Sequence, residues 1–347
     1  MKRIGWIFDK IISIDNLRAA HYETKRSKKA NRRDRAERYE RRLEKNLQKL
    51  HRRLLEGTWH MHKYINRRRC ERGKVRDIWY SANHEDSIVQ HAILRVLAPL
   101  VNKKLIRHTY ASIKGRGAHD CVKRLIRFIR SVPEGVPIWI LKVDIRHFYQ
   151  NIPHWAMHRA IDHFIKEQAT ARLLHGIIDS FPWGLPIGNA LSPMFANMLL
   201  SATDHEAKEK MRAPVYHRYL DDMVVIAIGN MKSFLRSILD WMSRHINMLG
   251  LQLKNNMQIF PIERHGLDFL GYVYRRTETV LRKKTERRFR RAARRWWKGS
   301  IEALQCLSSY WGITKWLSRG WALWFKLLPA DIHTMHKWAK MQAMATI

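Results

Sequence analysis

Apolar runs predict the strands of a small sheet in the middle of the chain. Residues 215–219 lead into a short polar segment, and residues 223–228 lead out of it as a β-branched and apolar run, which is the pattern of a β-hairpin. Residues 137–145 form a third run, whose apolar and β-branched side chains are typical of a buried strand. We therefore expect a sheet in which this strand lies near the hairpin.

Helical periodicity accounts for much of the remaining chain. Residues 24–53 are dense in charged side chains and carry four leucines at helical spacing, which predicts an amphipathic helix with a basic outer face: Leu43, Leu47, Leu50 and Leu54. Further helices are expected over 85–99 and 154–181, and the chain beyond residue 277 is a basic, tryptophan-rich helical region. Together with the hairpin, these helices predict an α+β fold.

Three carboxylates stand where the predicted strands end. The hairpin tip carries Asp221 and Asp222, and the strand over 137–145 delivers Asp144. A buried acid is costly without a cation, a metal ion or a strong hydrogen-bond donor. Acids on neighbouring strands can hold two Mg²⁺ ions for phosphoryl transfer, as in a polymerase or nuclease. The alternatives are an ordinary turn for the pair and a helix N-cap for Asp144.

The charge of the chain indicates its class of partner. The 66 Lys and Arg residues exceed the 30 Asp and Glu residues, so the formal net charge is +36. A field of this sign attracts polyanions, which makes nucleic acid the expected partner. No apolar run reaches about 18 residues and the first residues lack a signal-peptide core, so we expect a cytoplasmic protein without membrane contact. The three widely spaced cysteines favour neither a disulfide framework nor a zinc site.

The order of the motifs resembles that of bacterial reverse transcriptases. The likeness covers most of the chain: KVDIRHFY at 142–149, GLPIGNALSP at 184–193, YLDD at 219–222, FLGY at 269–272 and SYWG at 309–312. Among these enzymes the chain is most similar to those of diversity-generating retroelements, because the aliphatic Ile187 precedes Gly188 where most reverse transcriptases have Gln. The resemblance implies a right-hand polymerase with fingers (1–136), a palm (137–280, with a helical insertion over 154–181) and a helical thumb (281–347).

The resemblance also implies roles at the catalytic centre. Asp144 and Asp221 would be the principal ligands of two Mg²⁺ ions, with Asp222 supporting them and the backbone carbonyl of Ile145 completing a shell. Tyr149 stands where the family places a bulky aromatic residue under the nucleotide sugar, which would select deoxynucleotides. The alternative for Tyr149 is a core aromatic residue.

The resemblance also implies contacts with the incoming nucleotide at other positions. The hairpin around Gly73 resembles the fingers hairpin that covers this nucleotide in the family, so Lys74 and Arg76 fit triphosphate contacts or, alternatively, general RNA-backbone contacts. Ile187 cannot make the hydrogen bond of the usual Gln, which lowers selectivity and in diversity-generating retroelements accompanies errors at template adenines. Ser192-Pro193 departs from the Ser-Gln of that family, and Pro is usual in group II intron and many defence enzymes. A retron or defence-associated enzyme is therefore the alternative subtype.

The remaining assignments concern nucleic acid and partners. Arg116, between two glycines, fits a template or nucleotide contact or a plain surface loop. Arg287, Arg291 and Arg294 fit a thumb that tracks a template–primer duplex by charge, or the outer face of a bundle with a tryptophan core. The implied partners are a structured template RNA, its cDNA, deoxynucleotides and a small helical accessory protein. A non-catalytic RNA-binding scaffold is a third alternative.

Overall fold

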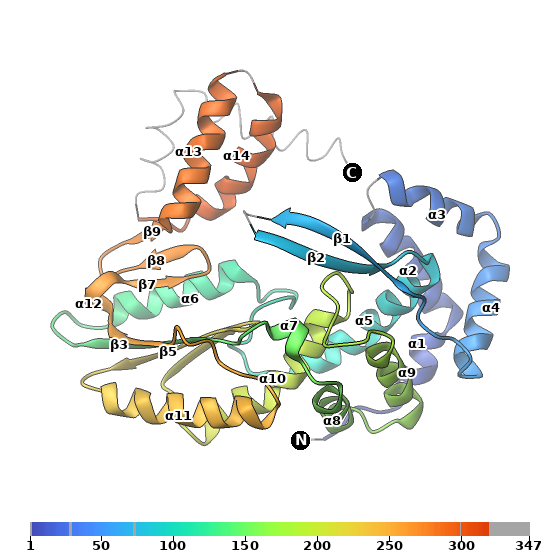
Figure 1. Ribbon diagram of the computed structural model, residues 1–347, viewed down its shortest axis with the longest axis horizontal. Helices are drawn as coiled ribbons and strands as arrows, with labels where there is room; N and C mark the ends of the chain where they lie inside the picture. Colours follow the sequence, from blue (N-terminus) through green and yellow to red (C-terminus); the bar gives the residue numbers. More distant parts are fainter. Residues whose placement is uncertain (1, 28–29, 72–73, 299, 319–347) are drawn as a thin grey trace. The chain divides into compact units, whose positions relative to one another are not determined.

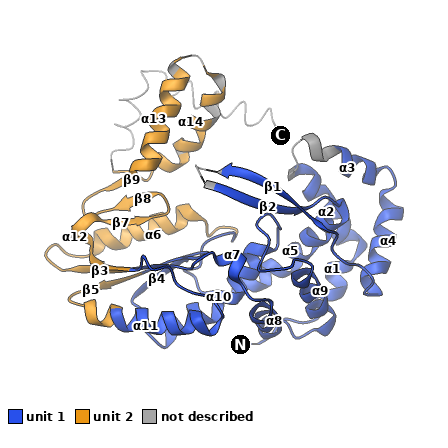
Figure 2. Cartoon of the chain, in the orientation of Figure 1, with its two compact units in different colours: residues 1–113, 142–224, 236–257 blue, residues 114–141, 225–235, 258–347 orange. Residues whose placement is uncertain are grey.

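The computed structural model describes the chain except for residues 1, 28–29, 72–73, 299 and 319–347 (Figure 1). The chain divides into two compact units, each assembled from several segments (Figure 2). Unit 1 comprises residues 1–113, 142–224 and 236–257, and unit 2 comprises residues 114–141, 225–235 and 258–347. The division into fingers, palm and thumb at residues 136 and 280 stays a prediction.

Unit 1 begins with helices that lie against one another (Figure 1) and bury apolar side chains such as Leu17, Leu47 and Ile88. These are α1 (Phe8–Ile12), α2 (Ile14–Ser27), α3 (Ala30–Glu40), α4 (Leu43–Leu55) and α5 (His84–Lys104). The prediction of one helix over 24–53 was wrong, because this stretch holds the end of α2, then α3, then α4. The apolar stripe explains the difference: Leu47, Leu50 and Leu54 are buried and belong to α4 alone.

The predicted strands are confirmed. They form a four-stranded sheet in the order β4-β5-β3-β6, from β3 (Ile138–Asp144), β4 (Val215–Tyr219), β5 (Asp222–Ile228) and β6 (Gln258–Pro261). The accompanying helices are α7 (Phe148–Asn151), α8 (His154–Phe164), α9 (Gln168–Asp179), α10 (Ser192–Glu209) and α11 (Lys232–Met248). The helical stretch expected over 154–181 is confirmed as two helices, α8 and α9.

A second hairpin belongs to unit 1. Strands β1 (Tyr64–Glu71) and β2 (Lys74–Ser81) pair antiparallel from Tyr64 opposite Ser81 to Glu71 opposite Lys74. This is the hairpin that the sequence predicted around Gly73, which itself lies outside the described residues. Most side chains along β1 are exposed, including those of Arg67, Arg68 and Arg69.

Unit 2 combines short strands with helices. Its elements include α6 (Ala118–Ser131), α12 (Ile262–His265), a sheet of β7 (Leu267–Phe269), β8 (Tyr272–Tyr274) and β9 (Thr279–Leu281), then α13 (Lys283–Trp297) and α14 (Ile301–Thr314). Phe289, Ala292 and Ala293 form the buried stripe of α13. No helix in the described part of the chain is long and apolar enough to span a membrane. Helices and antiparallel strands together confirm the α+β class.

Candidate active site

The turn between β4 and β5 carries the paired carboxylates. Asp221 lies in the turn itself, and Asp222 is the first residue of β5. Leu220 precedes them with φ +55°, in the left-handed region that a leucine side chain disfavours. Such a backbone conformation persists only where surrounding contacts hold it. The turn is therefore a constrained support for the two acids.

The three predicted acids interact electrostatically. Burial, and after it the negative charges of Asp144 and Asp222, raise the pKa of Asp221 to about 6. Asp144 ends β3, which lies next to β5 in the sheet, and β5 begins at Asp222. The positive charge of Lys254 acts in the opposite direction on Asp221.

Lys254 is a site residue that the sequence reasoning missed. Its Nζ lies 2.6 Å from each carboxylate oxygen of Asp144. The backbone fixes this pairing: Lys254 N donates to the Asp144 carbonyl at 2.8 Å, and Ile145 forms an antiparallel bridge with Leu253. Alternating apolar and polar residues over 250–254 were the available signal, since they are typical of a strand that places a lysine at its end.

The N-cap alternative for Asp144 is wrong. The next helix, α7, begins at Phe148, and its N-cap residue is His147 with φ +45°. Ile145 is fully buried next to Asp144. Asp144 thus serves as a carboxylate at the end of β3 with a lysine as its partner.

Tyr149 lies near Asp221 in the β4–β5 turn. Burial raises the pKa of its hydroxyl, and the negative charge of Asp221 raises it further. The Tyr149 carbonyl accepts a hydrogen bond of 2.7 Å from Leu185 N. Gly184 adopts φ +57°, and a Cβ there would lie 2.3 Å from the same carbonyl oxygen, so only glycine fits. This close approach locks the 184–193 segment against the backbone of Tyr149.

The same segment contacts the β1–β2 hairpin. Trp79 N on β2 donates to the Ile187 carbonyl at 2.7 Å. Gly188 has φ +115°, and a Cβ there would lie 2.7 Å from the Trp79 carbonyl. The Asn189 side chain donates to Tyr64 Oη at 2.9 Å. The structure therefore brings Ile187 and Gly188 next to the hairpin that carries the predicted triphosphate contacts.

Of the two residues predicted to contact the triphosphate, the structure describes the side chain of Arg76. Its side chain is exposed on β2, opposite Arg69. The side chain of Lys74 lies outside the described residues. Of two further predicted positions in unit 1, Ile187 is partly exposed and Gly188 is exposed, as nucleotide contacts require.

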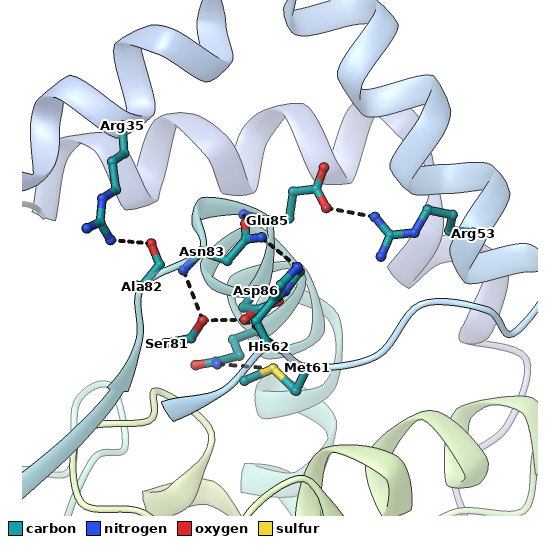
Figure 3. A network of polar contacts seen from close by, with 10 residues as sticks. Arg35, Arg53, Met61, His62, Ser81, Ala82, Asn83, Glu85 and Asp86 are labelled. Carbon is teal, nitrogen blue, oxygen red and sulfur yellow. Dashed lines mark hydrogen bonds and ion pairs between the residues drawn. The ribbon is translucent and has the colours of Figure 1, made fainter. Parts of the chain in front are cut away.

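A polar network anchors the base of the hairpin (Figure 3). Asp86, on the first turn of α5, is fully buried and accepts hydrogen bonds from His62 N at 3.1 Å and from Ser81 Oγ. The imidazole Nδ1 of His62 lies 2.9 Å from the other carboxylate oxygen. Asn83 caps α5 by accepting from Glu85 N at 2.8 Å. Because His62 precedes β1 and Ser81 ends β2, Asp86 ties both ends of the hairpin to one helix.

The predicted nucleic-acid contacts belong to unit 2. Arg116 is partly buried in the loop before α6. Arg287, Arg291 and Arg294 are exposed on α13 at a spacing that places them on one face, opposite the buried Phe289. Their amphipathic arrangement is confirmed, and their contact with nucleic acid stays a prediction.

The chemistry of the acids fits magnesium. Within the described ranges no three His, Cys, Asp or Glu side chains are arranged to hold an ion by themselves. Proteins usually bind Mg²⁺ through one or two carboxylates completed by water and substrate phosphates, rather than through a full protein cage. Burial, and after it the negative charges of Asp144 and Asp222, raise the pKa of Asp221, so a cation bound there would relieve the repulsion among the acids. Asp144, Asp221 and Asp222 therefore fit an ion that substrate phosphates help to bind.

Comparisons with known proteins bear on the family of the chain. The family model of reverse transcriptases (RNA-dependent DNA polymerases) matches residues 68–274, more than half of the chain. Protein YkfC of Escherichia coli K12 is 22% identical over 247 residues, which cover 58% of this chain and 63% of YkfC. The retron Ec73 reverse transcriptase of Escherichia coli is 35% identical over 83 residues, 22% of this chain and 26% of the relative. This chain thus spans less than two thirds of either relative.

Solved structures support the fold. Telomerase from Candida tropicalis matches with a TM-score of 0.52 at 13% identity, over 80% of this chain and 59% of the telomerase chain. The same telomerase in complex with a fragment of telomeric RNA matches with a TM-score of 0.51 at 14% identity, over 80% and 55%. This likeness confirms the predicted right-hand polymerase fold.

Proposed function

The chain belongs to the reverse transcriptase family, and we propose that it is an RNA-directed DNA polymerase that makes cDNA on a structured template RNA. One observation carries the proposal: three acids from β3 and the β4–β5 turn, Asp144, Asp221 and Asp222, interact with one another, and burial, followed by the charges of Asp144 and Asp222, raises the pKa of Asp221 to about 6. A non-catalytic RNA-binding scaffold has no need of three converging acids in a protein with a net charge of +36. This contrast favours an enzyme over a scaffold.

The three acids would hold two Mg²⁺ ions, with the Ile145 carbonyl as a further ligand. When bound, the ions supply activation of the primer 3′-hydroxyl and stabilisation of charge on the leaving pyrophosphate. Lys254 balances the charge of Asp144 before substrate enters. The ring of Tyr149 would exclude a 2′-hydroxyl and so select deoxynucleotides, and its electrostatic interaction with Asp221 supports this role.

The fingers hairpin would bind the incoming nucleotide. Arg76 offers a bidentate fork to the triphosphate and Lys74 a point charge. The backbone contact between Trp79 and Ile187 supports this role, because it joins the hairpin to the loop that precedes α10. In unit 2, Arg287, Arg291 and Arg294 would contact phosphates of the template–primer duplex, and Arg116 the template or the nucleotide.

Within the family, we propose an error-prone enzyme of a diversity-generating retroelement, with a small helical accessory protein as partner. Ile187 supports this subtype, because an aliphatic side chain cannot make the polar contact that rejects misaligned pairs. The second candidate is a retron or defence-associated enzyme. The 35% identity to the retron Ec73 reverse transcriptase favours it.

Primer extension tests the activity. The purified protein is given a defined RNA template, a DNA primer, deoxynucleotides and Mg²⁺, and the cDNA is sequenced. We expect product from the wild type and none from Asp221→Ala. Product that is equally abundant with both proteins would contradict the assignment of the site. If neither protein gives product, RNA from the same locus is added before the scaffold alternative is accepted.

The subtype is tested at a single residue. Ile187→Gln restores the polar side chain and is expected to lower misincorporation opposite template adenine, with little change in errors opposite the other bases. Leu185→Met, in the same loop, is a matched control, because Leu185 is buried and keeps an apolar side chain. An error spectrum that Ile187→Gln leaves unchanged would favour the retron or defence candidate.

A further inference from the structure

A buried ion pair lies beneath the catalytic turn and has no part in the mechanism above. Arg218 is on β4 and Asp204 is on α10, and both side chains have 0% exposure. Arg218 is among the largest fully buried side chains of the described residues. A buried guanidinium is costly unless its donors are satisfied, so its contacts define what it does.

Both side chains of the Arg218–Asp204 pair have hydrogen-bond partners. Arg218 Nε donates to Asp204 Oδ1 at 2.7 Å, and Nη2 donates to Oδ2 at 2.7 Å, which is the bidentate fork of a strong pair. The carboxylate also accepts from Tyr216 Oη at 2.7 Å and from Thr109 Oγ1 at 3.0 Å. The geometry of the guanidinium is therefore fixed by four donors around one carboxylate.

One edge of the guanidinium faces the turn. Arg218 Nη1 donates to the carbonyl of Leu220 at 3.2 Å and to Asn197 Oδ1 at 3.1 Å. Leu220 is the residue with φ +55°, and its carbonyl belongs to the peptide that links it to Asp221. Since a peptide group is planar, a hydrogen bond to that carbonyl sets the direction in which the chain enters Asp221.

The backbone of Arg218 is held as firmly as its side chain. Its amide donates to the His108 carbonyl at 3.0 Å, and its carbonyl accepts from Tyr110 N at 3.0 Å. The guanidinium thus reaches the turn from a strand that cannot shift without breaking the contacts of residues 108–110. A rigid base and a fixed fork are what a strained turn requires to keep one conformation.

We propose that Arg218 is a positioning residue of the polymerase site: the buried Arg218–Asp204 pair holds the Leu220–Asp221 peptide in the orientation that presents Asp221 to a divalent cation. The proposal rests on the proposed polymerase function. Lysine cannot replace arginine here, because one ammonium group cannot fork to Asp204 and also reach the Leu220 carbonyl.

Arg218→Lys tests the proposal, with Tyr216→Phe as the matched control. The control removes a buried donor from the same carboxylate but leaves the Leu220 contact intact. For Arg218→Lys we expect kcat to fall about 10- to 100-fold with the KM for template–primer unchanged, since small misplacements at a reacting centre have effects of this size. For Tyr216→Phe we expect kcat close to that of the wild type.

A second readout does not depend on polymerisation. Mn²⁺, followed by electron paramagnetic resonance, is titrated into each protein without nucleic acid. We expect Arg218→Lys to weaken binding about tenfold and Tyr216→Phe to leave it unchanged. This readout still decides the proposal if the wild type makes no cDNA, a result that would count against the proposed function alone.

Folding is checked by circular dichroism and thermal unfolding. If Arg218→Lys does not fold, the double variant Arg218→Met/Asp204→Leu replaces it, because removing both buried charges together is the change that such pairs tolerate best. It leaves the Leu220 carbonyl without its donor, and we expect the same loss of Mn²⁺ affinity and kcat. A folded variant of either kind with wild-type Mn²⁺ affinity and kcat would overturn the proposal.

Discussion

Two ion pairs flank the turn that carries Asp221 and Asp222, and they differ in how far their side chains are exposed to water. The front pair joins Lys254 to Asp144, with side chains 39% and 21% exposed, whereas the back pair joins Arg218 to Asp204 with both at 0%. The front pair has one donor on one carboxylate. In the back pair each member has further hydrogen-bond partners from other elements, including Asn197 and Thr109.

Because of this difference in exposure, the two ion pairs suit different roles. An exposed pair is weak and exchangeable, so a cation from solution can take the place of the lysine. A buried pair with full hydrogen bonding cannot exchange, because either partner alone would be left as an uncompensated buried charge. The front of the turn is therefore suited to binding a cation, and the back to holding a conformation.

The largest effect is expected at the front, in the chemistry itself. Asp222→Asn keeps the size of the side chain but removes a negative charge from the cluster. Since a bound metal ion contributes several kcal/mol of transition-state stabilisation, we expect cDNA synthesis to fall by about a thousandfold or more. RNA affinity, measured by filter binding, should stay nearly unchanged. Primer extension by Asp222→Asn at the wild-type rate would show that Asp222 is not part of the metal site, and the distinction between the front and the back of the turn would then fail.

The next effect is on stability and compares the two pairs directly. Asp204→Ala leaves the Arg218 charge buried without its partner, so we expect the free energy of unfolding to fall by about 3–5 kcal/mol. Asp144→Ala removes the exposed pair, and we expect a change of at most about 1 kcal/mol. Urea unfolding measures both. Equal losses would show that burial does not distinguish the pairs.

The sequence predicted the acids at the front of the site but missed Lys254 and the pair at the back. Asp144 ends one apolar run, and Asp221 and Asp222 immediately precede another, so their place at strand ends could be inferred from local pattern alone. Arg218 lies within such a run, between His217 and Tyr219, where a charged side chain is ordinarily exposed. It is buried only because Asp204, on another element, arrives to meet it.

The pairing of Lys254 with Asp144 could not be predicted, for a related reason. It lies 110 residues from Asp144 in the chain, and a lysine near a strand end is ordinarily a surface residue. The helices show the same limit at a smaller scale. The leucine spacing predicted a buried face correctly, but the charged residues around it did not reveal where α3 ends and α4 begins. Local periodicity gives the faces of elements, whereas pairings between distant residues require the folded chain.

A pH effect of intermediate size is expected at Asp221. Its pKa is raised to about 6, first by burial and then by Asp144 and Asp222. Below about pH 6 a proton competes with the cation, so the half-saturating Mg²⁺ concentration should rise by up to about tenfold per pH unit and be flat above pH 7. Extension rates across a Mg²⁺ series at each pH measure this.

The free energy of unfolding of the metal-free protein should depend on pH in the opposite direction to Mg²⁺ binding: binding strengthens as the pH rises, whereas this contribution to stability decreases. Because the folded pKa of Asp221 lies above its ordinary value of 3.8, the folded state binds more protons than the unfolded state between about pH 4 and pH 6. The contribution of this group to stability is thus present below pH 4 and is lost as the pH rises through 6. Asp221→Asn should remove that component from urea unfolding curves, and a curve unchanged by the substitution would contradict the raised pKa.

The smallest effect is expected from Lys254→Met, which keeps an unbranched side chain, one atom shorter, and removes its charge. Because an exposed ion pair contributes at most about 1 kcal/mol, loss of the competing ammonium should lower the half-saturating Mg²⁺ concentration by up to about fivefold. Lys25→Met is the matched control, since Lys25 and Glu40 also lie 2.6 Å apart with side chains 33% and 29% exposed, away from the site. Mg²⁺ titrations of extension, and Mn²⁺ titrations without nucleic acid, should both show the shift for Lys254→Met and not for Lys25→Met. If the half-saturating metal concentration shifts equally in both variants, the effect is due to net charge, and Lys254 does not compete specifically with the metal ion for Asp144.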